Sequence, residues 1–352
     1  MTESNPIADD PSTEKRISSI GVTVVVPSYL RGAKIEATLN SIQKQTRQPN
    51  EVIVVNDGSF QGTTDYVKDN FPSIRVIDIP HGGAALARNT GVQNAANPIV
   101  VLIDDDDIFR PEGVETLLKT LLTFPEARSA HGDNSYTHLG TGEHRERNIV
   151  EIEWIRNRLA KIQPLRIHAA VRLYGKALYY EMLRGNIIQQ PWAVYRDAYL
   201  AVGGFQAGLV SADDWDLYLR IARRFPVALT DELVGHHFTE PGRPHLTLDP
   251  RQIEGQIEAG ERQLKLAGWC DFKAIRILRK KLSGQYKFAG DQKRSSDLWV
   301  VWKCYSKSLL LWPFDAVVVV RTLVVLPAQI AQMYLVRSQK QRKLSETSCP
   351  KT

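Results

Sequence analysis

Four consecutive carboxylates directly follow a short apolar run. The run is Val100-Val101-Leu102-Ile103, and the carboxylates are Asp104 to Asp107. An unbroken run of Val and Ile is typical of a strand that is buried on both faces of a parallel sheet. Four acids cannot continue such a strand into a core, because an unpaired buried carboxylate costs too much free energy. We therefore expect them at the carboxyl end of the strand, where open α/β sheets bind ligands, either as a solvated turn or as oxygen ligands of a hard cation.

A second acidic cluster, made of Asp213, Asp214 and Asp216, precedes an apolar pattern of helical spacing. Leu217 and Ile221 fall on one helical face, so the carboxylates are expected in the first helical turn, where the helix dipole stabilises negative charge. Each Asp taken alone is typical of an N-terminal cap. A carboxylate in this position can also accept the proton that an attacking hydroxyl loses.

Strands and helices alternate along the first part of the chain. β-Branched runs that end in polar turns predict strands, and amphipathic spacing predicts helices. The predicted strands before the acidic one are 21–26, 51–55 and 74–79, and the predicted helices are 34–45, 63–70 and a helix from residue 84 to about Gly91. This alternation indicates a parallel sheet with right-handed crossovers.

Polar residues collect at the ends of these strands. Pro27-Ser28-Tyr29 follows the first strand, and Asn56-Asp57-Gly58-Ser59 follows the second. Together with the four carboxylates, these turns are expected to line one crevice. An acid at the second strand suits a hydrogen bond to a base or ribose, and the later acids suit a divalent metal with a diphosphate. No Gly-x-Gly-x-x-Gly follows the first strand and no Walker lysine is present, so a metal would have to neutralise the phosphates.

These motifs carry a resemblance to a known family. Val24-Val25-Val26-Pro27-Ser28-Tyr29, Val55-Asn56-Asp57-Gly58-Ser59, Ala87-Arg88-Asn89-Thr90-Gly91 and Leu102-Ile103-Asp104-Asp105-Asp106-Asp107 resemble, in order and spacing, the nucleotide-sugar half of family 2 glycosyltransferases of GT-A fold. The resemblance implies a mixed, mostly parallel α/β sheet flanked by helices. The family usually has Asn after its Tyr, where this sequence has Leu30.

The resemblance also implies a set of donor-site residues. Those that bind the nucleotide sugar are Pro27 and Tyr29 in the base pocket, Asp57 on the base, Arg88 near the phosphates, and Asp104 and Asp105. The Asp-x-Asp motif of the family matches Asp104-Asp105-Asp106, so Asp104 and Asp106 are expected to bind Mg²⁺ or Mn²⁺. A late histidine completes the metal or diphosphate site in many GT-A enzymes, and His237 is the candidate here.

The second acidic cluster resembles the catalytic motif of the same family. Asp213-Asp214-Trp215 matches its Glu-Asp-Trp motif with Asp in place of Glu. The match implies that Asp214 is the general base of an inverting transfer and that Asp213 lies beside it near the acceptor. An inverting transfer needs only one in-line displacement, in which the acceptor hydroxyl loses its proton as it attacks the anomeric carbon.

Charge is distributed unevenly along the chain. Residues 269–352 contain sixteen Lys and Arg against five Asp and Glu, whereas residues 1–268 are mildly acidic. A basic tail favours contact with an anionic surface such as a membrane, although a solvated helical face has the same composition. Three cysteines without metal-ligand spacing favour a reducing compartment. We therefore predict a cytoplasmic protein that is peripheral at the inner face of the cell membrane, and we expect no nucleic-acid partner.

Four segments are predicted. They are a disordered lead-in (1–19), a nucleotide-sugar-binding half (20–125), an acceptor-binding and catalytic half (126–250) and a helical basic extension (251–352). Within them, 154–180, 251–265 and 274–287 are expected to be helical, and His131, His138 and His144 are expected on the surface. Residues 308–336 contain Arg321 and Pro327, which favours an interfacial amphipathic segment or packed helices over a spanning helix.

The predicted function is transfer of a sugar from a nucleoside-diphosphate sugar, with UDP the first candidate, to a hydroxyl acceptor. The acceptor is a glycan, a lipid-linked molecule or a small molecule. The alternative is a non-catalytic protein of the same fold that binds nucleotide sugars or carbohydrates, which the intact Asp213-Asp214-Trp215 motif argues against. A nucleotidyltransferase would need a Gly-rich basic phosphate loop, and Leu30-Arg31-Gly32 is too short for one.

Overall fold

The computed structural model describes residues 11–58, 62–146, 153–209, 211–239, 252–292, 298–313, 318–319 and 322–323. The chain forms two compact units, Met1–Asp249 and Pro250–Thr352. The finer division of the first unit into a donor half and an acceptor half stays a prediction.

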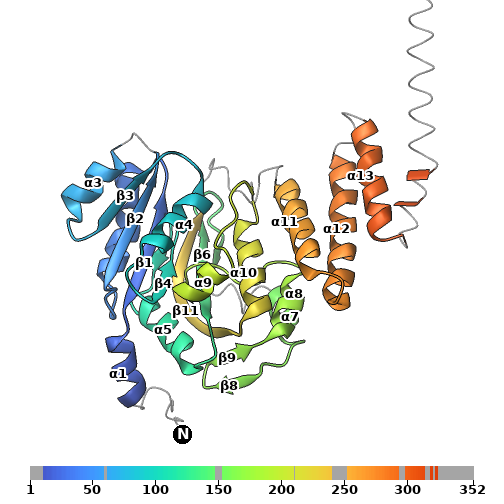
Figure 1. The fold of residues 1–352 in the computed structure, drawn as a ribbon. Coiled ribbons are helices and arrows are strands. Elements are labelled where there is room, and N and C mark those ends of the chain that lie inside the picture. Colours follow the sequence, from blue (N-terminus) through green and yellow to red (C-terminus); the bar gives the residue numbers. More distant parts are fainter. Residues whose placement is uncertain are drawn as a thin grey trace, which may run out of the picture. The chain divides into compact units, whose positions relative to one another are not determined.

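The first unit is built on a single mixed sheet (Figure 1). Within the described residues the sheet has eleven strands, of which nine follow the order β3-β2-β1-β4-β10-β6-β11-β9-β8. In chain order the strands are β1 (Val22–Ser28), β2 (Glu51–Asp57), β3 (Arg75–Ile79), β4 (Ile99–Leu102), β5 (Ile108–Phe109), β6 (Ser129–His138), β7 (His144–Arg145), β8 (Arg166–His168), β9 (Val171–Tyr174), β10 (Trp192–Tyr195) and β11 (Val227–Thr239). The predicted mixed, mostly parallel α/β fold with a helical extension is therefore confirmed.

Helices connect these strands. They are α1 (Pro11–Ser19), the 3₁₀ helix η1 (Gly32–Ile35), α2 (Glu36–Gln43), α3 (Thr63–Asn70), α4 (Ala84–Asn94), α5 (Gly113–Thr123), α7 (Glu153–Leu159), α8 (Lys176–Met182), α9 (Arg196–Ala201) and α10 (Asp213–Arg224). The predicted strands and helices of the first hundred residues are confirmed. Their order places β1 to β4 parallel and adjacent, whereas β10 is antiparallel to both β4 and β6.

Apolar side chains pack between the sheet and helices on both of its faces. On one face, β1 and β4 pack with α2 and α5 through side chains such as Val24, Leu39, Val101 and Leu118. On the other face, Ile53 and Val55 of β2 contact Ala87 of α4. This alternation follows from the period of two along a strand, which sends successive side chains to opposite faces.

The α4 helix lies very close to β1. A Cβ atom at Gly91 would be 2.3 Å from Cγ1 of Val25, a separation that real side chains do not reach. Gly91 is the last residue of the Ala-Arg-Asn-Thr-Gly motif, so the glycine of that motif allows the helix to approach the sheet. This approach positions the neighbouring Arg88 at the carboxyl edge of β1 and β4.

Three predictions about local structure are wrong. Residues 11–19 are helical, and Ile17 is buried in the core, so the disordered lead-in does not extend that far; residues 1–10 lie outside the described part. Residues 154–180 contain the β8–β9 hairpin between their two helices, because β9 pairs with the distant β11. His131 is buried, stacked on Trp192 with ring centroids 5.2 Å apart, because β6 is a central strand. His138 is half-buried and His144 is exposed.

The second unit contains three helices, α11 (Gln252–Ala267), α12 (Phe272–Gln292) and α13 (Leu298–Leu311) (Figure 1). α11 packs on α12 through Ile257, Leu282 and Tyr286, and Ser283 of α12 hydrogen bonds with Ser308 of α13 at 2.9 Å. The helices predicted at 251–265 and 274–287 are confirmed. Most of residues 308–336 lies outside the described residues. Over the part of the chain that the structure describes, the helices are too short or too polar to cross a bilayer.

Candidate active site

Three turns lie together at one edge of the sheet. β2, β1 and β4 lie side by side (Figure 1). Because they are parallel, Asp57 and Ser28 at the carboxyl ends of β2 and β1, and Asp104 just after β4, lie at the same edge of the sheet. Pro27 is buried within β1, opposite Val55 of β2. The three turns that the sequence was expected to bring together therefore do lie at one edge of the sheet.

Asp57 organises the turn at the end of β2. Its carboxylate accepts hydrogen bonds from the backbone N–H groups of Gly82 (2.7 Å) and Gly83 (2.8 Å), and His81 Nδ1 lies 2.9 Å from Oδ2. The His81 ring stacks on Tyr29, with centroids 4.3 Å apart, and Tyr29 is 45% exposed. His81 thus contacts both Tyr29 and Asp57, so an exposed aromatic ring lies near a fixed carboxylate.

The four carboxylates after β4 do not form one solvated turn. Asp105 and Asp106 both pair with Nη2 of Arg31, at 2.7 and 3.0 Å. Burial and the neighbouring Asp107 and Asp104 raise the pKa of Asp106 to about 7. Because Asp105 and Asp106 share one arginine, additional positive charge beside Asp106 would stabilise its ionised form.

His237 reaches this cluster from β11. Its Nδ1 lies 2.8 Å from Oδ2 of Asp107, and its Nε2 is buried without a hydrogen-bond partner. A carboxylate on one imidazole nitrogen leaves the other nitrogen as a lone-pair donor, which is the usual arrangement of a metal-binding histidine. Within the described ranges no three His, Cys, Asp or Glu side chains stand close enough to hold a metal by themselves. The carboxylate oxygens nevertheless fit Mg²⁺ or Mn²⁺.

Arg88 connects the first acidic cluster to the second. Its Nη2 is 2.7 Å from Oδ1 of Asp104, and its Nη1 is 3.2 Å from Oδ2 of Asp213. The guanidinium is buried and lies 5.0 Å from the centre of the Phe205 ring. Burial opposes its charge, but Asp104 and Asp213 raise the pKa of Arg88. One buried cation therefore serves both acidic motifs, which are more than a hundred residues apart in the chain.

Asp214 occupies the first turn of α10. The preceding Ala212 has a left-handed backbone (φ 61°), an uncommon conformation for a residue with a side chain. Asp214 accepts hydrogen bonds from the Trp215 N–H (2.6 Å) and from Nδ2 of Asn186 (3.0 Å). Burial and the charge of Asp213 raise the pKa of Asp214 to about 6. Its carboxylate can therefore hold or release a proton near neutral pH.

Three contact residues were not predicted from the sequence. Arg31 pairs with the first acidic cluster, Asn186 with Asp214, and Asn89 holds the loop before α10. Asn89 binds both the N–H and the C=O of Phe205 (2.9 and 2.8 Å) and accepts the hydroxyl hydrogen bond of Tyr199 (2.6 Å). Its place in the Ala-Arg-Asn-Thr-Gly motif was the available signal, whereas no local pattern marks Asn186.

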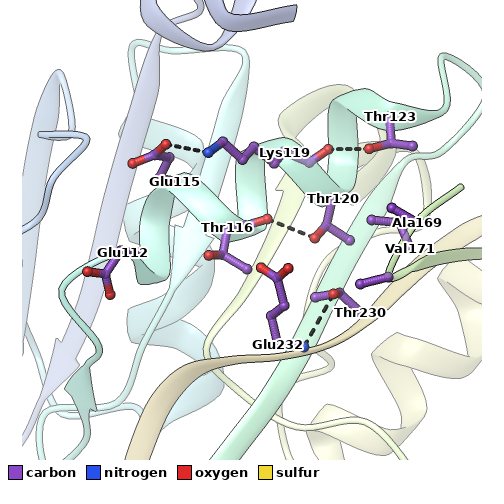
Figure 2. Close-up of a pocket in the computed structure, with 11 residues that line it drawn as sticks. Glu112, Glu115, Thr116, Lys119, Thr120, Thr123, Ala169, Val171, Thr230 and Glu232 are labelled. Atoms are coloured by element: carbon purple, nitrogen blue, oxygen red, sulfur yellow. Dashed lines mark hydrogen bonds and ion pairs between the residues drawn. The ribbon is translucent and has the colours of Figure 1, made fainter. Parts of the chain in front are cut away.

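A separate pocket lies between α5, β9 and β11 (Figure 2). Its volume is about 220 Å³, and its lining includes Glu112, Thr116, Thr120 and Glu232. Glu115 at its rim pairs with Lys119 at 2.6 Å. No residue of the two acidic clusters lines it, so the predicted chemistry belongs to the strand-end site.

Comparison with known proteins gives one family match. The family model "Glycosyl transferase family 2" matches residues 23–180, which confirms the resemblance found in the motifs. An uncharacterized glycosyltransferase of Haemophilus influenzae is 26% identical over 200 residues, covering 57% of this chain and 61% of the relative. The chain therefore spans about three fifths of the length of that relative.

Solved structures share the fold. TarS of S. aureus in complex with UDP-GlcNAc has a TM-score of 0.60 at 17% identity, over 83% of this chain and 81% of that chain. The mannosyltransferase PcManGT of Pyrobaculum calidifontis, in complex with GDP-Man and Mn²⁺, has a TM-score of 0.53 at 17% identity, over 87% of each chain.

Proposed function

Because residues 23–180 match the model of glycosyl transferase family 2, we propose that this chain is an inverting, metal-dependent glycosyltransferase that uses a nucleoside-diphosphate sugar. The observation that supports this most directly is the Arg88 bridge. It joins Asp104 at the strand-end site to Asp213 at the start of α10, so a donor and an acceptor can be held within one connected site. The complexes of TarS with UDP-GlcNAc and of PcManGT with GDP-Man support a nucleotide-sugar donor and leave the base open.

The donor is held at the strand ends. Tyr29 offers its exposed ring to the base, beside the carboxylate of Asp57, while Arg88 and Arg31 supply positive charge for the diphosphate. Asp104, Asp106 and His237 are the residues that would supply ligands to Mg²⁺ or Mn²⁺ once a bound donor adds oxygen ligands of its own, and such an ion would stabilise negative charge on the departing nucleoside diphosphate. Asp105 is held by Arg31 at 2.7 Å and fixes the turn between the two metal-binding carboxylates.

Asp214 acts as the general base. The acceptor hydroxyl attacks the anomeric carbon, a new C–O bond forms, and the bond from that carbon to the diphosphate oxygen breaks. The carboxylate of Asp214 takes the hydroxyl proton as the attack proceeds. Asn186 and the Trp215 N–H orient the carboxylate, and Asp213 is fixed beside it by Arg88.

A donor screen tests the proposed function. The chain is incubated with UDP-, GDP- and dTDP-sugars and Mn²⁺, with hydroxyl acceptors that include envelope lipids, and the released nucleoside diphosphate is measured. Acceptor-dependent release from one donor class is the expected result. Tight donor binding without release for any acceptor would instead support a non-catalytic binding protein.

Asp106→Ala is expected to abolish the metal dependence of donor binding. In the wild type, Mn²⁺ should tighten binding of the nucleoside diphosphate by on the order of 10–100-fold, and the variant should lose most of this gain because it lacks one carboxylate. Calorimetric titration with and without Mn²⁺ measures the ratio. Asp69→Ala, at an exposed position of α3, is the control, and an unchanged ratio in Asp106→Ala would remove Asp106 from the metal site.

The pH profile should follow the ionisation of Asp214. Only the deprotonated carboxylate can act as a base, so kcat/KM is expected to rise by about tenfold per pH unit below the pKa and to level off above it. With the pKa at about 6, the plateau begins near neutral pH. Asn186→Ala removes a hydrogen bond that favours the charged form and should move the rising limb to higher pH. Asn157→Ala, on α7, is the control and should leave the rising part of the pH profile at the wild-type pH. If the profiles of Asn186→Ala and Asn157→Ala rise at the same pH, the assignment of Asp214 is contradicted.

A further inference from the structure

The turn between α11 and α12 exposes an apolar tip. Trp269 is 92% exposed, Phe272 78% and Leu266 46%. We use "hairpin tip" for residues Leu266 to Phe272. Large aromatic side chains are seldom so exposed unless they contact a partner, and here three large apolar groups lie within seven residues.

The hairpin tip is a fixed structural feature. Gly268 ends α11 with a left-handed backbone (φ +62°), and the Asp271 carboxylate accepts a hydrogen bond from the Ala274 N–H (3.1 Å) at the start of α12. Behind the tip, the two helices pack through buried Ile257 and Leu282. Trp269 therefore projects from a turn whose two ends are both capped.

Basic residues surround the tip. Between Glu261 and Asp291 the chain has eight Lys and Arg and one acid, Asp271, whose carboxylate caps α12. We use "basic ridge" for Lys273, Arg276, Arg279 and Lys280, which all lie on exposed positions of α12. At helical spacing these four residues continue from Phe272 along one side of α12.

We propose that the hairpin tip and the basic ridge form a docking surface for an anionic lipid bilayer. Trp and Phe sit favourably at the boundary between head groups and acyl chains. Lys and Arg beside them are attracted to the negative surface potential of the membrane. The surface thus combines the two signals, apolar insertion and positive charge, that reversible membrane binding requires. The proposal does not depend on the transferase activity.

Vesicle binding by the full chain tests the proposal. Co-sedimentation is measured with vesicles of pure phosphatidylcholine and with vesicles containing about one third phosphatidylglycerol, at low and high salt. The wild type should bind the anionic vesicles preferentially and more weakly at high salt. The double variant Trp269→Ser/Phe272→Ser, and the charge variant Arg276→Gln/Arg279→Gln/Lys280→Gln, should each bind about tenfold or more weakly.

Control variants test whether vesicle binding depends on this surface or only on the number of exposed aromatic and basic residues in the chain. Trp299→Ser removes another exposed aromatic (63% exposed), and Lys44→Gln/Lys68→Gln/Lys161→Gln removes three exposed charges from the first unit. Both controls should bind as the wild type does. Thermal unfolding of every variant checks that the fold is kept. Equal binding by the wild type and the Trp269→Ser/Phe272→Ser variant would overturn the proposal.

A label on the exposed Cys270 gives a second measurement. In a Cys304→Ser/Cys349→Ser background, an environment-sensitive fluorophore at Cys270 should shift to the blue and be quenched by spin-labelled lipid. Absence of both changes with anionic vesicles would contradict insertion of the tip. Preferential binding of RNA over anionic vesicles at equal phosphate would also overturn the proposal. The proposal would also be overturned if the Trp269→Ser/Phe272→Ser variant formed a smaller oligomer than the wild type but bound vesicles equally well.

Discussion

Asp214→Asn is expected to lower kcat by about 10²–10⁴-fold while the affinity for the donor changes by less than about twofold. The amide has nearly the shape of the carboxylate and can accept the hydrogen bond that Asn186 donates to Oδ2, but it cannot take a proton. Pre-steady-state turnover and calorimetric titration of the nucleoside diphosphate separate the two effects. Near-normal turnover would exclude Asp214 as the base.

The same substitution should not destabilise the protein at high pH. The folded-state pKa of Asp214, about 6, lies above the unfolded value. The folded state therefore binds more protons, and the wild type loses stability as pH rises from about 4 through about 6. Asp214→Asn carries no charge, which favours the variant at pH 8 by up to about 3 kcal/mol in free energy of unfolding, but its NH2 group would face one of the two N–H donors that the carboxylate accepts from, which offsets part of that gain. Urea denaturation at pH 4 and pH 8 gives the comparison, and a large loss of stability at pH 8 would show that the charged form is stabilised in the fold.

Arg88→Met is expected to cost about 3–5 kcal/mol of unfolding free energy and to abolish transfer. Met can fill much of the space beside Phe205, but it leaves Asp104 and Asp213 without the cation that lies 2.7 and 3.2 Å from them. Removing one partner of a buried ion pair leaves an uncompensated charge, which is far more costly than losing an exposed pair. The midpoint of urea unfolding at pH 7 measures the effect.

Arg75→Gln provides the matched control. Arg75 pairs with Glu51 at 3.4 Å, but its side chain is 50% exposed, so its loss should cost less than about 1 kcal/mol. A second variant, Arg88→Met/Asp213→Asn, should recover part of the stability because one of the two carboxylates is neutralised, and it should remain inactive. If Arg88→Met unfolded like Arg75→Gln, the buried bridge would not be a stabilising contact.

Much of the donor side could be predicted from short stretches of sequence. The runs Val22–Val26, Val52–Val55 and Ile99–Leu102 are mostly apolar because both of their faces are covered by helices, and this is a local signal. Their shared direction then dictates that the following turns meet at one edge. Asp57 and Asp104 could thus be placed together without any knowledge of their contacts, although their roles at a nucleotide sugar are still predictions.

Features that depend on distant partners could not be predicted. The β8–β9 hairpin forms because β9 pairs with β11, more than fifty residues later in the chain. His131 is buried because β6 lies between β10 and β11, and its polar sequence neighbours gave no indication of this. Asn186 reaches Asp214 across 28 residues. In each case the decisive contact is made by the tertiary fold, and the local pattern is uninformative.

The position of Arg88 between the two acidic motifs has a thermodynamic consequence. A single guanidinium pairs with Asp104 after β4 and with Asp213 at the start of α10, so a ligand that draws it toward one carboxylate weakens its pairing with the other. A ligand bound at one carboxylate must then change the affinity for a ligand at the other by the same factor in both directions, because such coupling is reciprocal at equilibrium. Under the proposed function, donor-site binding and acceptor-site binding would therefore be coupled through this one shared counterion, whichever substrate binds first.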